Sequence, residues 1–134
     1  MAIEGFLIGP ALLMGAIIGL IELIFVHSDE AHMGWLMHGL HALPATMLFV
    51  FISMNISFVF GLLNLSITVN PFVNFGVRLV IAVIAMLKIC VAAAIAGRVG
   101  EKFPHTIAIG ALVFAAPYVW EFALASVLGP MLPF

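Results

Sequence analysis

Four long apolar stretches, separated by short polar breaks, make up most of this chain. Each is close to the ~20 residues that an α-helix needs to cross the ~30 Å hydrocarbon core of a bilayer. With 66% hydrophobic and 7% charged residues, the chain has too few charges to cover the surface of a soluble domain. The sequence therefore predicts four transmembrane helices, at about 3–26, 43–65, 75–96 and 107–128.

The predicted fold is all-α: one membrane domain, 1–134, in which the four helices form an up-down bundle. Between the first two stretches, Ser28 is a suitable N-cap, and Asp29 and Glu30 favour the positive end of a helix. Trp35 suits the membrane–water interface. We therefore expect a short interfacial helix at about 29–42, after which Pro44 either begins the second membrane helix or lies within a longer one.

Four crossings place both termini on the same side of the membrane. Arg98 and Lys102 lie on the opposite, loop side. Because positive loops stay in the cytoplasm, their position favours termini that face outside.

The charge balance excludes nucleic-acid binding, and the chain contains none of the common enzyme motifs. A net charge of −2 and four Lys and Arg residues provide no basic patch for nucleic acid. The chain contains no G-x-S-x-G, H-E-x-x-H, P-loop or G-x-G-x-x-G motif. We therefore expect a protein that is not an enzyme and whose surroundings are the lipid bilayer and membrane proteins.

Four charged residues fall within or at the edge of the apolar stretches: Glu22, Arg78, Lys88 and Glu121. A charge in the hydrocarbon core costs several kcal/mol, so it normally faces the bundle interior and finds a partner. Estimated depths predict two pairs, Glu22 with Lys88 and Arg78 with Glu121. Such pairs either fix the order of the helices or form part of a path for protons or cations.

The histidines gather at the loop side of the predicted bundle, where they are candidate metal ligands. They are His27, His32, His38, His41 and His105. His38 and His41 are three residues apart and can face one point from a helix. Imidazole suits Cu or Zn, and nearby methionine sulfur favours Cu(I). Haem b held by His38 or His41 together with His105 is a further alternative, and interfacial histidines without a cofactor are another.

Glycines four apart on the first helix predict close helix contacts. The two pairs are Gly5 with Gly9 and Gly15 with Gly19. Small residues at this spacing let backbones approach each other in lipid, either within the bundle or against another chain.

With little chain outside the membrane, we expect a non-catalytic integral membrane subunit of a larger complex, with a loop-side His/Met metal site as an additional feature. A homo-oligomeric transporter or channel for metal ions or protons is the first alternative. A haem- or metal-binding redox subunit is the second.

Overall fold

A computed structural model of the chain describes residues 6–30, 34–65, 70–95 and 102–133, and this part of the chain is helical with no strand. The helices along the chain are α1 (Ile8–Asp29), α2 (Trp35–Met54), α3 (Ile56–Leu62), α4 (Pro71–Ile95), α5 (Phe103–Val119), a π-helical turn (Trp120–Leu124), α6 (Ala125–Leu128) and a 3₁₀ turn (Gly129–Met131).

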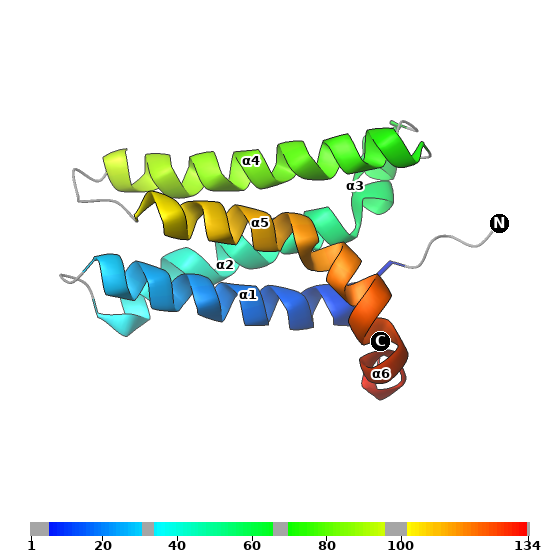
Figure 1. Cartoon of the computed structure of the whole chain (residues 1–134), viewed down its shortest axis with the longest axis horizontal. Helices are drawn as coiled ribbons and strands as arrows, with labels where there is room; N and C mark the ends of the chain where they lie inside the picture. The colour runs from blue at the N-terminus through cyan, green and yellow to red at the C-terminus, as the bar shows by residue number, and fades with distance from the viewer. Residues whose placement is uncertain (1–5, 31–33, 66–69, 96–101, 134) are drawn as a thin grey trace.

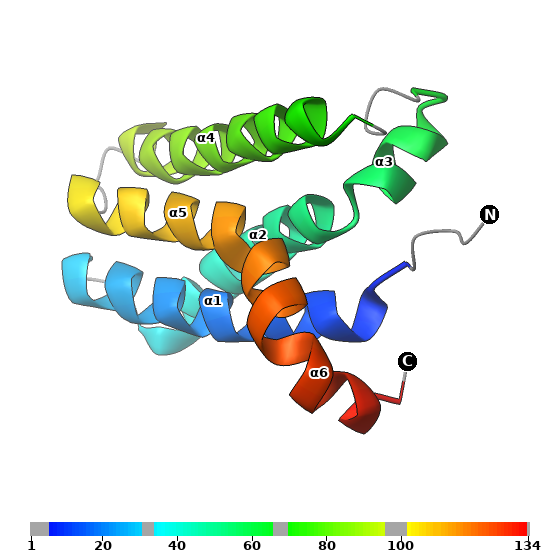
Figure 2. The same ribbon diagram turned by 45° about the vertical axis from the view of Figure 1, so that its right-hand side comes forward.

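Four helical segments are long and apolar enough to cross a membrane. They are Ile8–Asp29, Trp35–Met54, Pro71–Cys90 and Phe103–Met131. Successive segments run in opposite directions, with α4 lying along α5 and α1 along α2 (Figures 1 and 2). The predicted all-α membrane bundle is confirmed, and the protein is a multi-pass membrane protein.

The bundle has two distinct ends. At the terminal end, α1 begins at Ile8, and α3 and α6 lie nearby (Figure 1). At the loop end, α1 finishes at Asp29 and α5 begins at Phe103. Which end faces the cytoplasm stays a prediction.

Large apolar side chains are exposed on every span, including Leu20, Leu48, Val83 and Val119. Such a surface is stable when acyl chains cover it, which agrees with the predicted contact with the bilayer.

The second span differs from its prediction at both ends. Among the described residues of 29–42, no separate interfacial helix is present. Instead α2 begins at Trp35 and continues through Pro44 to Met54. His38, Ala42 and Thr46 are all buried at a spacing of four, so the helical face continues across the proline. Pro44 removes one backbone hydrogen bond, which a helix anchored on both sides tolerates in a membrane. The predicted interfacial helix is therefore corrected to the first turns of α2.

A break at Asn55 separates α2 from α3 and is stabilised by the asparagine side chain. Asn55 leaves the helical region of backbone space, with φ −119° and ψ 39°. Its Oδ1 accepts a hydrogen bond from the Leu7 N–H at 2.7 Å, and its Nδ2 donates to the carbonyls of Phe51 at 3.1 Å and Leu7 at 3.3 Å. One buried amide thus serves the backbone at the α2–α3 break and at the start of α1. Without it, the Leu7 N–H would lose its acceptor and face hydrocarbon without water.

A second polar side chain compensates for a proline in the last span. Pro117 has no N–H, so it cannot bond the carbonyl of Val113 four residues earlier. The hydroxyl of Ser53 donates to this carbonyl at 2.9 Å from α2. Three residues after Pro117, the helix changes to the π-helical turn 120–124. At Pro117 the free carbonyl of Val113 therefore has a donor from α2, and a wider, π-helical turn follows.

Glycines on α1 set the close approach of α1 to α2. A Cβ added at Gly15 would lie 3.2 Å from the Cα of Met47, and one at Gly19 would lie 2.9 Å from the Cδ2 of Leu43. Both residues therefore face a helix of the same chain rather than a partner protein. Gly9 is buried, whereas Gly5 lies outside the described residues.

Replacing Gly15 by leucine should weaken the bundle, because the new side chain would meet backbone atoms of α2. Overpacking of this kind costs about 1–3 kcal/mol. The matched control is Gly76→Leu on α4, where an added Cβ meets nothing within 4 Å. Reversible unfolding in mixed detergent, followed by circular dichroism, measures both. Equal stability of the two variants would contradict this account of helix packing.

Candidate functional site

Polar side chains from three helices meet at the loop end of the bundle. The end of α1, the start of α2 and the start of α5 each contribute, and we call the group the loop-end cluster. Its members are His27, Asp29, Glu30, Trp35, His38, Lys102 and His105.

Asp29 joins the end of α1 to the beginning of α5. Its side chain is only 1% exposed. Oδ2 accepts a hydrogen bond from the backbone N–H of Lys102 at 2.9 Å and lies 2.6 Å from Nδ1 of His105, while Nζ of Lys102 is 3.5 Å from Oδ1. Lys102 is the N-cap residue of α5 and provides no side-chain cap of its own. A carboxylate from α1 therefore performs the capping of α5, where the helix dipole favours negative charge.

His105 is held in a fixed orientation. Its ring stacks on Phe25 with centroids 4.2 Å apart and planes 9° from parallel. With Nδ1 directed to Asp29, a neutral His105 carries its proton on Nδ1 and keeps a lone pair on Nε2. The ring can thus donate one hydrogen bond inward and still accept one at its other nitrogen.

A second group of contacts links α1 to the start of α2. Nδ1 of His27 lies 3.0 Å from Nδ1 of His38, and Nε2 of His38 lies 3.8 Å from Oε2 of Glu30. The ring of Trp35 stacks on His27 with centroids 3.6 Å apart. His38 is 0% exposed. Since a hydrogen bond between two Nδ1 atoms needs one donor and one acceptor, the two imidazoles share a proton between them.

The structure divides the predicted metal ligands into separate contacts. His27 and His38 lie together, His105 binds Asp29, and Nδ1 of the exposed His41 donates to the carbonyl of Met37 in its own helix at 2.7 Å. His32 lies outside the described residues. Among the residues that are described, no group of three or more His, Cys, Asp or Glu side chains is arranged to hold a metal ion. The Cu, Zn or haem site predicted at these histidines stays a prediction.

The four intramembrane charges occupy two kinds of position. Glu22 is 2% exposed in the interior, and the half-buried Arg78 donates from Nε to the Ser53 carbonyl at 3.1 Å, with its guanidinium 5.1 Å from the centre of the Tyr118 ring. Lys88 and Glu121, in contrast, are exposed on the bundle surface.

The predicted pair of Arg78 with Glu121 is absent from the ion pairs of the described residues. The prediction assumed regular α-helical spacing through the last span. The π-helical turn at 120–124 changes this spacing and turns Glu121 outward.

Sequence reasoning identified most members of the cluster but not how they pair. It placed Asp29 at the positive end of a helix in its own segment, whereas Asp29 bonds the start of α5. A usable signal was present, because Pro104 marks the start of a helix whose preceding residues include no Ser, Thr, Asp or Asn close enough to cap it.

Asp29→Ala should destabilise the bundle by about 1–3 kcal/mol, because it removes a buried acceptor and leaves the Lys102 N–H at the start of α5 without its partner. Lys102→Ala should have a smaller effect, since its side chain is 68% exposed and its backbone N–H remains. Detergent unfolding of the two variants provides the comparison. A larger loss for Lys102→Ala than for Asp29→Ala would contradict the capping role.

No protein-family model, curated protein or solved structure matches this chain. Arguments about function therefore depend on the residues and their geometry. Two arrangements stand out. In the loop-end cluster, polar side chains from three helices of this chain contact one another. Lys88 and Glu121, in contrast, are exposed on the bundle surface.

Proposed function

We propose that this protein is a non-catalytic integral membrane subunit of a larger membrane protein complex. The observation that carries the proposal is the exposure of Lys88 on the outside of the bundle, roughly 10 Å from the loop end of α4 at ~1.5 Å per residue and within a candidate membrane span. Glu121, exposed near the opposite boundary of the last span, is a second charged residue on this surface. Charged residues in membrane helices face a protein interior or a water-filled cavity, because hydrocarbon does not solvate them. A neighbouring membrane protein that covers both residues would provide such surroundings.

The remaining charges provide a comparison within the same molecule. Glu22 and Arg78 are enclosed by helices of this chain, and Arg78 has a carbonyl and an aromatic ring as partners. Helices of this chain therefore surround two of the four intramembrane charges, at least in part. Lys88 and Glu121 lie among exposed apolar residues such as Leu87 and Phe122, which suit contact with lipid or with another apolar helix.

The different depths of Lys88 and Glu121 in the membrane favour a different protein, rather than a second copy of this chain, as the partner. Lys88 is seven residues before the end of α4 and Glu121 eighteen residues after the start of α5, and these two helix ends meet at the loop end (Figure 1). At a rise of ~1.5 Å per residue, the two charges differ in depth by roughly 15 Å. Copies inserted in the same orientation are related by an axis along the membrane normal, which preserves depth. Lys88 of one copy would therefore not reach Glu121 of another.

The partner that fits this surface is a transmembrane protein with a carboxylate at the depth of Lys88 and a cationic or hydrogen-bonding group at the depth of Glu121. The glycine face of α1 does not contribute, because Gly15 and Gly19 contact α2. The contact surface would instead lie on α4 and the last span.

A transporter or channel for protons or metal ions is the second candidate, favoured by the titratable groups at the loop end. His27, His38 and Glu30 form a connected series. The buried Glu22 lies at a similar depth, since a Cβ added at Gly39, the residue next to His38, would lie 4.0 Å from Cδ1 of Leu23, the neighbour of Glu22. Such a series could pass a proton between the loop end and the interior, but the path across the remaining bilayer would need other residues.

The test is purification of the full chain from its native membranes in mild detergent, with native mass and metal content measured on the same sample. We expect co-purifying membrane proteins at fixed stoichiometry. Lys88→Leu and Glu121→Leu should each remove the partner, and Lys88→Arg, which keeps the charge, should retain it. The isolated Leu variants should be at least as stable as the unmodified protein, because each removes an exposed charge from hydrocarbon.

Two results would overturn the proposal. One is association that the Lys88→Leu and Glu121→Leu variants retain in full. The other is a homo-oligomer that holds near-stoichiometric metal and loses it when His38 and His41 are replaced by alanine. The second result would establish a metal site and favour the transport function.

A further inference from the structure

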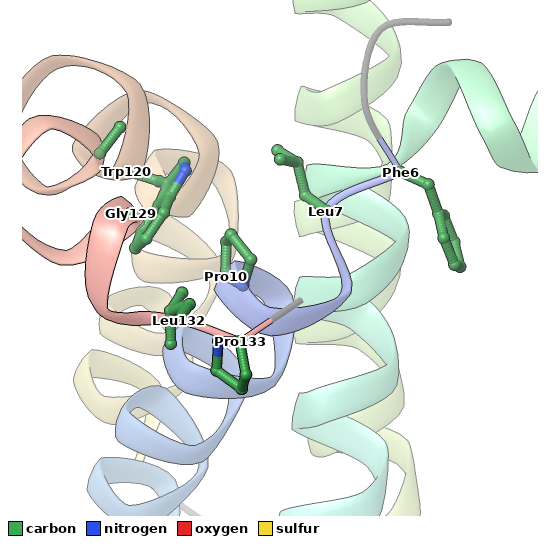
Figure 3. A pocket seen from close by; sticks show the side chains of 8 residues that line it. Phe6, Leu7, Pro10, Trp120, Gly129, Leu132 and Pro133 are labelled. Carbon is green, nitrogen blue, oxygen red and sulfur yellow. The ribbon is translucent and has the colours of Figure 1, made fainter.

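A cleft of about 380 Å³ opens at the terminal end of the bundle, between the start of α1 and the segment that follows the π-helical turn (Figure 3). Leu7 and Pro10 form one side, while Trp120, Gly129 and Leu132 form the other. The volume falls in the ~300–1,000 Å³ range of small-molecule sites. Since the lining side chains are predominantly apolar, the cleft suits an apolar guest.

One polar group is directed into this apolar cleft. Trp120 is 6% exposed, yet no described residue accepts a hydrogen bond from its indole N–H. Figure 3 shows the ring nitrogen on the side of Trp120 toward Leu7 and Pro10. Because an indole N–H that opens into an apolar cleft at membrane depth has no water to bond, the arrangement calls for a ligand with an apolar body and one acceptor oxygen.

The depth of Trp120 in the membrane indicates the source of that oxygen. Trp120 follows the start of α5 by seventeen residues, which places it roughly 26 Å from the loop end at ~1.5 Å per residue. In a hydrocarbon core of ~30 Å, this position is a few ångströms inside the opposite boundary. Indole rings favour this zone, where acyl chains join their headgroups.

We propose that the cleft is a phospholipid site. One acyl chain lies between the start of α1 and Trp120, and its ester carbonyl accepts a hydrogen bond from the indole N–H. The site is independent of the subunit role proposed above, because the cleft involves neither Lys88 nor Glu121.

Gly129 offers a way to close the cleft without disturbing the helices. A Cβ at this position meets nothing within 4 Å, and its φ of −53° is accessible to any residue. Since Gly129 lines the cleft, a leucine there adds a bulky side chain at its wall without backbone strain. Gly61 on α3 is a matched control at the same end of the bundle, since a Cβ there also meets nothing within 4 Å and the residue lies outside the cleft (Figure 1).

The experiment uses the full chain in phosphatidylcholine vesicles that contain a phosphatidylcholine with a diazirine on one acyl chain. After irradiation, peptide mapping should locate label mainly around Trp120 and Leu132 and at the start of α1. Gly129→Leu should remove this label, and Gly61→Leu should leave it unchanged. Trp120→Phe should reduce it roughly fivefold, the change expected from loss of one hydrogen bond, as should an ether-linked probe without the ester carbonyl.

Label spread evenly over the exposed faces of the spans, or full labelling of Gly129→Leu, would overturn the proposal. Circular dichroism shows whether each variant is folded. Should Gly129→Leu fail to fold, the ether-linked probe on the unmodified protein decides: labelling equal to that of the ester probe rejects the hydrogen bond to Trp120.

Discussion

The structure depends on one constraint, which is that every backbone polar group in hydrocarbon needs a partner within the protein. A regular helix satisfies this constraint with its own backbone hydrogen bonds. The constraint therefore shows most clearly where a helix is interrupted. At Asn55, a buried amide bonds the backbone of Leu7 and Phe51. At Pro117, the hydroxyl of Ser53 replaces the missing intrahelical donor to Val113. At both positions, the side chain that satisfies the interrupted helix also joins two helices. These hydrogen bonds help to fix which helices pack together.

The same constraint organises the loop end. The first N–H groups of α5 have no partner within that helix, and Asp29 supplies one from α1. His105 completes the contact and is itself held by Phe25. The histidine pair His27–His38 lies on the other side of α1, toward α2. A cluster that resembled ligands in the sequence is therefore, among the described residues, a set of interhelical contacts.

Much of the fold could be predicted from the sequence, because four apolar stretches of membrane length permit few arrangements. The ends of the helices could not, since they depend on partners distant in sequence. Pro44 looked like a boundary, but the burial of His38 and Thr46 on one face keeps α2 continuous. Glu121 looked inward on a regular helix, but the π-helical turn changes its direction. The identity of the charged residues was visible in the sequence, whereas the division into enclosed and exposed charges required the fold.

The contact between Asp29 and Lys102 spans 73 residues, from the end of the first membrane helix to the beginning of the last. During synthesis, Asp29 is made well before Lys102, its partner 73 residues later in the chain. In a chain that ended before α5, the Asp29 carboxylate would lack its partners Lys102 and His105. The α1–α2 pair would also lack the helix that packs against both of them. The contact can form only after the last helix has packed, so it distinguishes a complete bundle from an incomplete one.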